Sequence, residues 1–309
     1  MNDRAAVRPI TVSIAAVERD TGLSKDTLRV WERRYGFPSP VRDAYGERAY
    51  PLDQVEKLRV IKRLLDNGHR PGRVVAMSID ELQSIGENLA ASPQRLNTAE
   101  HADLREFIVA IKAHDVQSLR RLLGQSLMRL GAGAFVCDVV APLNIMVGDA
   151  WMRGQIEVFE EHMYTESVNI VLRHAISVAP MAASSAQPRV LLTTFPQEPH
   201  GLGLLMAEVM LSLEGAQCIS LGTQTPIWDI VLAATAHKAD VVALSFTASQ
   251  NPNYVINGLD ELRSKLPLPI KIWVGGGSPV IHRKAMEGVQ VIADLPSIRD
   301  AIGVWRSQR

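Results

Sequence analysis

Five short apolar segments alternate with helical segments in the C-terminal part of the sequence, and this alternation constrains the fold more than any other feature. The apolar segments are Val190–Thr194, Cys218–Leu221, Val241–Ser245, Ile270–Val274 and Val289–Ile292. Segments with helical periodicity follow them, at 203–214, 226–237, 254–265, 279–287 and 297–306. Strands that alternate with helices form a parallel sheet with helices on both faces. We therefore expect residues 186–309 to fold as an α/β domain with a doubly wound parallel sheet.

The loops that leave these strands should meet at one edge of the sheet, where open α/β sheets bind ligands. The first such loop, Glu198–Gly203, places a carboxylate two positions before His200. A carboxylate in that position can orient the imidazole ring and raise the basicity of its second nitrogen, as the partners of metal-bound histidines do. Gly201 and Gly203 allow the backbone to turn tightly and to approach a large flat ligand.

Together with two later elements, this loop resembles the signature of the cobalamin-binding domain family, which reads Asp-x-His-x-x-Gly, then Ser-x-Leu, then Gly-Gly. The counterparts in this sequence are Glu198, His200 and Gly203, then Ser245 and Thr247, then Gly275 and Gly276. Gly222 and Thr225 resemble another recurrent element of the family, beside the edge of the corrin. The sequence departs from the signature twice, because a glutamate replaces the aspartate and a threonine replaces the leucine.

The resemblance implies a role for each of these residues. In the family the histidine displaces the cofactor's own base and becomes the lower ligand of the cobalt, so His200 is the implied metal ligand and Glu198 orients it. Ser245 and Thr247 would hydrogen-bond the nucleotide tail of the cofactor, and Gly275 and its neighbour would let the backbone pass close to it.

Two other α/β domains were weighed against the cobalamin domain. A nucleotide-binding Rossmann domain would need the complete Gly-x-Gly-x-x-Gly fingerprint, and Gly201-Leu202-Gly203 is only part of it. A response-regulator-like domain would need acidic residues at the end of its first strand, where this sequence has Thr193 and Thr194. Neither alternative explains His200 together with the later serine and glycine elements.

Residues 103–185 carry several amphipathic helices in succession, which predicts a four-helix bundle. Helices are expected from Leu104 onward, from about 134 to 151, and from about 158 to 176, with Pro142 starting or kinking part of the second of these ranges. Residues 81–102 are of mixed composition and are expected to form a linker that is partly helical and partly flexible.

A tryptophan followed after nine residues by Glu161-His162 stands out in this helical region. Taken alone, Trp151 is a core residue and the acid–histidine pair is a solvated helix start. The spacing resembles a signature of the cobalamin-dependent photoreceptor regulators of the CarH type. That resemblance implies that the bundle caps the upper face of adenosylcobalamin, with Trp151 over the adenosyl group and Glu161 and His162 lining its pocket. An indole face is a suitable stacking surface for adenine.

One position departs from those photoreceptors. Their better-known members have a histidine directly after the tryptophan, where this sequence has Met152. A thioether is a weaker ligand for Co(III) than an imidazole. The upper ligand after exposure to light is therefore open between water, Met152 and His162.

The first 80 residues predict a helix-turn-helix domain. Helices are expected over 15–21 and 25–34, with a cap for the first helix in Thr11-Val12-Ser13, Gly22 at the turn and Ser24 as the cap of the second helix. The side chains expected to read bases or grip phosphates from this helix and its end are Lys25, Thr27, Arg29, Arg33, Arg34 and Tyr35. The N-terminal residues of such a helix meet base edges in the major groove.

A proline-rich stretch with arginines and tyrosines follows the second helix. Prolines 38 and 40 exclude a helix there, and the composition of residues 38–50 suits a short hairpin on a phosphate backbone, contacted by Arg42, Arg48 and Tyr50. Residues 53–67 then predict an amphipathic helix that Gly68 ends.

The order of these parts resembles the MerR family of transcriptional regulators over about the first 75 residues. Three phrases match its pattern: Ser24-x-x-Thr27-Leu28-Arg29-x-Trp31-Glu32, Arg48-x-Tyr50 and Asp53-x-x-x-x-Leu58-x-x-Ile61. The family is a winged helix-turn-helix with two further helices. The resemblance implies dimers that bind a near-palindromic double-stranded operator, while Trp31 is best explained as a core residue of this domain.

Charge and cysteine content fit these expectations. The formal net charge is zero, but residues 1–80 hold 15 Lys and Arg against 11 Asp and Glu, so the N-terminal domain is the basic part. Cys137 and Cys218 lie in apolar segments and suggest buried thiols in a reducing compartment. We see neither a signal peptide in Met1–Val12 nor an apolar run of the roughly 18 residues that span a membrane, so a cytoplasmic protein is expected.

Three functions are compatible with this organisation. The first is a DNA-binding regulator, expected to be a repressor, that senses light through adenosylcobalamin and changes between oligomeric states, as homodimer or homotetramer, when the Co–C bond is cleaved. The second is a corrinoid carrier of a methyltransferase or mutase, which the N-terminal domain argues against. The third is a MerR-type regulator that retains the fold and works without a cofactor.

Overall fold

The computed structural model of the protein describes residues 11–66, 69–82, 85, 101–178, 187–248, 250–283 and 285–308. Most of the expected linker lies outside these ranges. Gly68, the expected end of a helix, lies outside them as well. The chain divides into two compact units, the first made of Met1–Gln94 with Met152–Gln155 and the second made of Arg95–Trp151 with Ile156–Arg309.

The first unit is built around a helix-turn-helix. Its elements are β1 (Thr11–Ser13), α1 (Ile14–Thr21), α2 (Lys25–Tyr35), β2 (Val41–Arg42), β3 (Arg48–Pro51), α3 (Leu52–Asp66) and α4 (Pro71–Val74). Ser13 and Ser24 cap α1 and α2 by accepting hydrogen bonds from the backbone N–H groups of Ala16 and Thr27. Gly22 ends α1 in the left-handed conformation, with φ of 69°. The predicted caps and turn are confirmed.

A small antiparallel sheet completes this unit and forms its wing. The strand order is β1-β3-β2, with Val12 opposite Tyr50 and Arg42 opposite Arg48. The strand β1 was not predicted, because residues 11–13 were expected only to cap α1. Leu28, Trp31 and Leu58 are buried in the core between α2, α3 and the sheet, which confirms Trp31 as a core residue.

The helical part of the second unit contains α6 (His101–Lys112), α7 (Val116–Leu130), α8 (Ala132–Ala134), a π-helical segment η1 (Phe135–Val140), α9 (Ala141–Met152) and α10 (Val158–Val178). The second expected helix is therefore interrupted by η1, in which the N–H of Ala141 donates to the carbonyl of Val136. Pro142 has no N–H to donate, so the regular α-helical ladder is broken where η1 meets α9.

The helices α8, η1 and α9 run continuously over Ala132–Trp151. This run corrects the expectation that the chain has no apolar run long enough to span a membrane. It is long and apolar enough, by length and composition only, to cross a membrane. Phe135, Val140 and Leu143 of the run are nevertheless fully buried in the protein core. A buried helix in the core of a folded domain passes the same test, so we assign the run to the core of the bundle.

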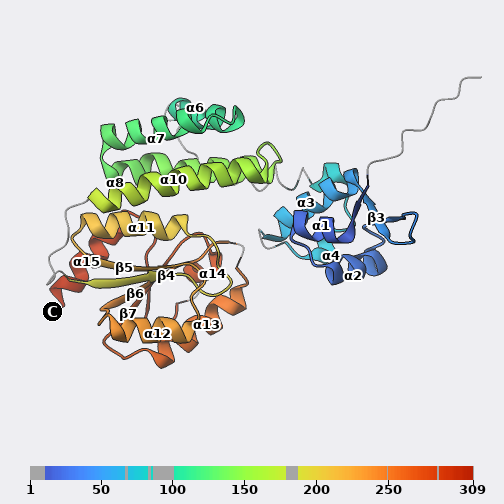
Figure 1. The fold of residues 1–309 in the computed structure, drawn as a ribbon. Helices are drawn as coiled ribbons and strands as arrows, with labels where there is room; N and C mark the ends of the chain where they lie inside the picture. The colour runs from blue at the N-terminus through green and yellow to red at the C-terminus, as the bar shows by residue number, and fades with distance from the viewer. Residues whose placement is uncertain are drawn as a thin grey trace, which may run out of the picture. The chain divides into compact units, whose positions relative to one another are not determined.

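The remainder of the second unit is an α/β domain with a five-stranded parallel sheet (Figure 1). Its strands are β4 (Arg189–Thr193), β5 (Gln217–Gly222), β6 (Val241–Ser245), β7 (Lys271–Gly275) and β8 (Val289–Val291). Its helices are α11 (Leu202–Leu213), α12 (Ile227–Ala236), α13 (Pro252–Lys265), α14 (Pro279–Arg283) and α15 (Ser297–Ser307). All five predicted strands are confirmed, and α14 ends four residues earlier than the expected range 279–287.

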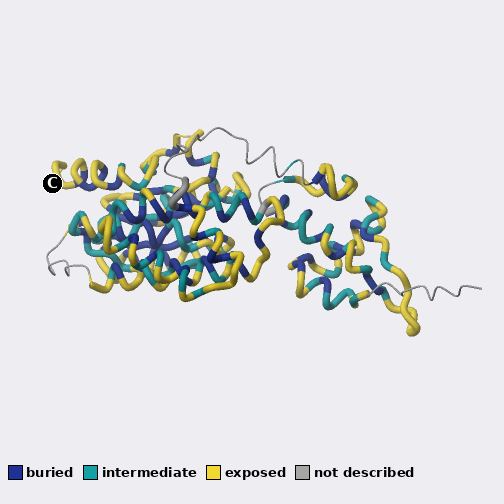
Figure 2. Tube along the Cα trace, turned by 90° about the horizontal axis from the view of Figure 1, so that it is seen from above, coloured by how far each residue is buried: buried dark blue, intermediate teal, exposed yellow. Residues whose placement is uncertain are grey.

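The helices cover both faces of this sheet, as predicted. The helices α11 and α15 pack on the face that includes Val190 and Leu192, whereas α12 and α13 pack on the face that includes Leu191 and Val242. Both layers are visible in Figure 1, and in Figure 2, seen from above, the buried parts of the tube gather in the middle of this domain. The apolar strand sequences arise from this burial on both faces.

The bundle and the α/β domain share one core. Leu205, Met206 and Val209 of α11 belong to the same buried cluster as Tyr164 and Val168 of α10. Helix α11 therefore has two apolar faces, one against the sheet and one against the bundle, which explains its almost continuously apolar sequence.

The strand order of the sheet is β5-β4-β6-β7-β8, so the chain leaves β4 for β5 on one side and later returns to β6 on the other. The loops after β4 and β6 therefore separate at this point, which is the topological switch point of the sheet. Ligands of open α/β sheets bind in the crevice outside the carboxyl ends of the strands at such a point.

Candidate functional site

The loop after β4 carries a histidine held by a fully buried carboxylate. The side chain of Glu198 is 0% exposed, whereas that of His200 is 58% exposed. Nδ1 of His200 lies 2.5 Å from Oε1 of Glu198. A carboxylate can only accept, so Nδ1 carries the proton and Nε2 is the nitrogen that a metal could use. The predicted orienting role of Glu198 agrees with this geometry.

The other oxygen of the same carboxylate is bound from the neighbouring loop. Thr247, after β6, donates to Oε2 of Glu198 from its backbone N–H at 2.8 Å and from its hydroxyl at 2.7 Å. Glu198 thus joins the two loops of the switch point. The threonine at this position, unusual for the cobalamin signature, has a function that leucine could not perform: its hydroxyl donates to the longer glutamate.

These contacts also decide the charge of Glu198. Burial alone would raise the pKa of this carboxyl group, but the hydrogen bonds from His200 and Thr247 outweigh burial and hold the pKa below its ordinary value. Glu198 is therefore ionised at neutral pH and keeps its hold on the Nδ1 proton of His200.

Two polar side chains that were not predicted from the sequence, those of Thr194 and Gln250, support the β4 loop. The hydroxyl of Thr194 donates to the carbonyl of Glu198 at 2.6 Å and accepts from the N–H of Gln224 at 2.8 Å. The amide of Gln250 donates to the carbonyl of Gln197 at 2.6 Å. Thr194 directly follows a buried strand, which was the available sequence signal, whereas nothing local marks Gln224 or Gln250.

Glycines allow the loops around this histidine to approach each other closely. A Cβ on Gly203 would lie 2.9 Å from the hydroxyl oxygen of Ser245. A Cβ on Gly276 would lie 2.3 Å from the carbonyl oxygen of Phe246, and its φ of 107° is itself unfavourable for any other residue. The Gly–Gly and Ser elements of the signature are therefore in contact with each other at this edge.

The remaining predicted residues of this domain lie at the same edge. Gly201 precedes α11, and a Cβ there would lie 3.2 Å from Thr223. Gly222 ends β5 with a positive φ, and the hydroxyl of Thr225 lies 2.7 Å from that of Thr193. Gly275 is the last residue of β7.

The predicted cap residues lie at one end of the bundle. Trp151 is half-buried near the end of α9, and Glu161 and His162 lie in the first turn of α10. Nδ1 of His162 lies 2.7 Å from one oxygen of Glu161, and the hydroxyl of Thr165 donates to the other at 2.6 Å. The side chain of Met152 lies outside the described part of the structure.

Helices α10 and α11 run in the same direction, which relates this end of the bundle to the histidine. Asn144 of α9 accepts from the hydroxyl of Tyr164, early in α10, and donates to the sulfur of Met206, early in α11. Glu161 and His162 at the start of α10 and His200 just before α11 therefore belong to the same end of this unit; Figure 1 shows α10 and α11 side by side. This shared end is where the cap and the lower loop were expected to meet.

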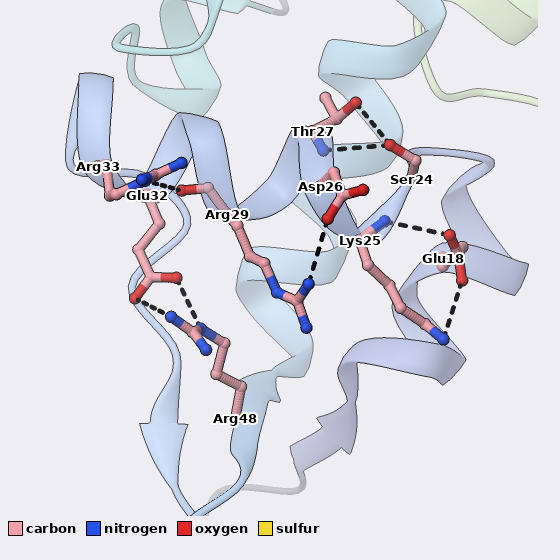
Figure 3. Close-up of polar contacts among 9 residues, drawn as sticks. All are labelled: Glu18, Ser24, Lys25, Asp26, Thr27, Arg29, Glu32, Arg33 and Arg48. Carbon is pink, nitrogen blue, oxygen red and sulfur yellow. Dashed lines mark hydrogen bonds and ion pairs between the residues drawn. The ribbon is translucent and has the colours of Figure 1, made fainter.

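Recognition helix α2 and the wing carry the predicted DNA-binding residues, and three of the cations are paired with acids (Figure 3). Lys25 pairs with Glu18 at 3.5 Å, Arg29 with Asp26 at 3.2 Å and Arg48 with Glu32 at 2.8 Å. These acids were not predicted as partners from the sequence. Only the pair with Asp26 had a local signal, the three-residue spacing on one helix.

The other predicted DNA contacts divide into exposed and buried residues. Arg33, Arg34 and Arg42 are exposed, Thr27 and Tyr35 are half-buried, and Thr27 shares a hydrogen bond with the hydroxyl of Ser24 at 2.8 Å. Tyr50 is 0% exposed and packs in the core of the unit, so the structure does not bring its side chain to the surface expected to face DNA.

Comparison with known proteins gives the class that this fold defines. Residues 12–78 match the MerR HTH family regulatory proteins, residues 104–176 match one B12-binding domain family and residues 188–295 match a second. The monomethylamine corrinoid protein of Methanosarcina barkeri has a similar fold, with a TM-score of 0.52 and 17% identity over 66% of this chain and 99% of its own. The chain is thus a MerR-type helix-turn-helix regulator with B12-binding domains.

Two relatives span nearly the whole chain. It is 30% identical to the HTH-type transcriptional repressor CarH of Myxococcus xanthus over 93% of this chain and 95% of CarH. It is also 30% identical to the repressor CarA of the same organism, over 97% of this chain and 98% of CarA. The chain belongs to the CarH/CarA family of HTH-type transcriptional regulators. It is a cobalamin-binding transcriptional regulator and not an enzyme.

The residues at the sheet edge fit a cobalamin. His200, an exposed imidazole at this edge, has its Nδ1 hydrogen-bonded to a buried carboxylate, so Nε2 is the nitrogen that could bind cobalt. Among the described residues, no cluster of three or more His, Cys, Asp or Glu side chains could hold a bare metal ion. This donor set suits a metal that brings its own equatorial ligands.

Proposed function

We propose that this regulator is a light-responsive repressor that senses light through adenosylcobalamin. The observation that carries the proposal is the buried Glu198, which fixes the tautomer and orientation of His200 at the switch point of the sheet. The related proteins CarH and CarA are transcriptional repressors, which supports repression as the output. We expect the protein to act in the cytoplasm, on double-stranded operator DNA.

The chain's own residues have two tasks in this proposal. His200 would bind the cobalt through Nε2, and Trp151, Glu161 and His162 would contact the adenosyl group from the end of the bundle. Ser245, Thr247, Gly275 and Gly276 would contact the nucleotide tail, and Gly222 and Thr225 would lie beside the corrin. When bound, the cofactor supplies a Co–C bond that light cleaves.

The regulatory step requires that DNA affinity differ between two states of the protein. We propose that Trp151 and the Glu161–His162 pair hold the bundle in its dark arrangement through contact with the adenosyl group, in a homodimer or homotetramer that binds the operator. Loss of that contact favours a second arrangement with lower DNA affinity. The coupling energy equals the difference in ligand affinity between the two states.

The test uses the full-length protein, adenosylcobalamin and a DNA duplex that the same protein has enriched from a random-sequence pool. In the dark we expect a cobalamin absorbance spectrum with the nucleotide base displaced, an oligomer in size-exclusion chromatography, and DNA binding. Illumination should change the spectrum, the oligomeric state and DNA affinity together. His200→Ala should abolish the spectral shift of the lower ligand, while His237→Ala, at an exposed histidine after α12, should leave it intact.

Two outcomes would reject the proposal in different ways. A protein that binds adenosylcobalamin but shows the same oligomer and DNA affinity in light and dark is not a light sensor. A protein that binds the duplex and shows no cobalamin spectrum after mixing is a regulator that works without the cofactor.

A further inference from the structure

An acidic residue lies in the middle of the DNA-facing helix and connects it to the wing. Glu32, in the third turn of α2, accepts from Nε of Arg48 at 2.8 Å and from its second guanidinium nitrogen at 3.5 Å. Arg48 is the first residue of β3, so the pair joins recognition helix and wing across 16 positions of sequence. Both side chains are about a quarter exposed, so the pair is partly shielded from solvent.

The hairpin itself does not need this pair to fold. Its strand β3 pairs with β1, and the segment before β2 is held by two hydrogen bonds between Ser39 and Gln54 of α3. Its tip is closed by Asp43, whose carboxylate accepts from the N–H groups of Tyr45 and Glu47. Among the hydrogen bonds and ion pairs of the described residues, those that join α2 to β2 or β3 are made by Glu32 and Arg48.

On electrostatic grounds alone, Glu32 should weaken DNA binding at this position. It lies between Arg29 and Arg33 on a helix that must approach a polyanion, and a carboxylate there repels phosphates. Asp26 has the same disadvantage, but its partner Arg29 is on the same helix, so that pair cannot orient one element against another. Figure 3 shows both pairs from one side.

We propose that Glu32 is a positioning residue for DNA binding, which fixes the angle between the wing and the recognition helix. The ion pair with Arg48 holds the hairpin so that α2 in the groove and the exposed Arg42 on the adjoining backbone engage one duplex together. Without the pair, the hairpin stays folded, but its angle to α2 becomes fixed only when the protein binds DNA. DNA affinity then falls although a negative charge has been removed.

The test uses the fact that removing the charge of Glu32 should raise DNA affinity, whereas losing its positioning role should lower it. Glu32→Gln is made in the natural sequence and in an Arg48→Gln background, and Asp26→Asn is the matched control in both. Binding of the full-length protein to a duplex that it has enriched from a random pool is measured across a range of salt concentrations. One phosphate contact changes affinity about fivefold near 0.15 M salt, since affinity varies with salt to a power of about −0.9 per contact.

We expect Glu32→Gln to lower affinity at least about fivefold in the natural sequence and to reduce the salt slope by about one contact. In the Arg48→Gln background the carboxylate has no partner to position, so the same change should raise affinity. Asp26→Asn should raise affinity in both backgrounds. Hydroxyl-radical footprints should lose protection beneath the wing in Glu32→Gln and keep it in Asp26→Asn.

The sign pattern decides between this role and its alternatives. An increase in both backgrounds would show that Glu32 acts only as a charge, and would overturn the proposal. A decrease in both backgrounds would show that Glu32 supports the core of the unit instead, and thermal unfolding of the same variants would then show a lowered midpoint. Unchanged affinity in the natural sequence would also overturn it.

Discussion

Replacing Glu198 with glutamine tests the core of the proposed cobalamin site, because it keeps the shape of the side chain and changes one acceptor into a donor. Oε1 of Glu198 accepts from the ring and backbone of His200, and Oε2 accepts from the backbone and hydroxyl of Thr247. A glutamine can satisfy only one of these two sides. If its NH2 group faces His200, the ring must take the tautomer with the proton on Nε2, which cannot bind cobalt.

The size of the expected loss follows from what the hydrogen-bond partners of ligating histidines contribute in metal sites. Loss of a partner that orients a ligating histidine costs about 10- to 100-fold in metal affinity, or about 1.4–2.8 kcal/mol. If the NH2 group faces Thr247 instead, the backbone N–H of Thr247, whose hydrogen bond is partly buried, loses its acceptor, which costs about 1 kcal/mol or more of folding stability. Either orientation of the glutamine amide therefore has a measurable effect, on cobalamin affinity or on folding stability.

The assay is a titration of the purified protein with adenosylcobalamin in the dark, followed by absorbance, together with urea unfolding of the cofactor-free protein. Thr247→Val is the matched control: it removes the hydroxyl donor and leaves the backbone N–H, so we expect it to lower cobalamin affinity less than Glu198→Gln. Glu198→Asp keeps the charge and should fall between the natural protein and the glutamine variant. Equal cobalamin affinity and equal stability in Glu198→Gln would refute the reasoning.

Three further predictions follow from the same geometry. The pKa of Glu198 lies below its ordinary value of 4.5, so its stabilising contribution is present above that value and is lost as the pH falls through the lowered pKa; the stability difference between the natural protein and Glu198→Gln, measured by urea unfolding, should therefore shrink as the pH falls below 4.5. Gly276→Ala should lower the free energy of unfolding by more than about 2 kcal/mol because its Cβ meets the carbonyl of Phe246 at positive φ; Gly277→Ala, where nothing lies within 4 Å, is the control, and similar melting temperatures for the two variants would contradict the prediction. Trp151→Ala should weaken binding of adenosylcobalamin about threefold to tenfold and leave hydroxocobalamin unaffected, since one stacking contact is worth about 0.5–1.5 kcal/mol; Trp228→Ala, at an exposed tryptophan of α12, is the control, and equal losses for both cobalamins would remove the proposed contact.

Local signals explain most of what the sequence predicted. Strands buried on both faces must be apolar along their whole length, so β4 and β6 were found with their bounds nearly correct. The caps Ser13 and Ser24 act within three residues of their partners. The pairing of Glu198 with His200 was predictable for the same reason, since only one residue separates them.

Long-range contacts explain what the sequence did not predict. The contact of Thr247 with Glu198 joins positions 49 residues apart, and that of Arg48 with Glu32 joins positions 16 apart. Strand β1 has only three residues and exists because β3 lies beside it. Burial of Tyr50 depends on the packing of the helices of this unit against the sheet, which no periodicity within residues 48–51 could show.

The second apolar face of α11 limits how a signal could leave the cofactor site. Lifting the bundle away would return Leu205, Met206 and Val209 to water, at a cost of about 1.5–3 kcal/mol for each side chain and so about 5–9 kcal/mol in total. Sliding of α10 along α11 keeps those side chains covered, and packed helices tolerate such small displacements. Transmission by a shear of the two helices, with the interface kept dry throughout, is therefore favoured over undocking.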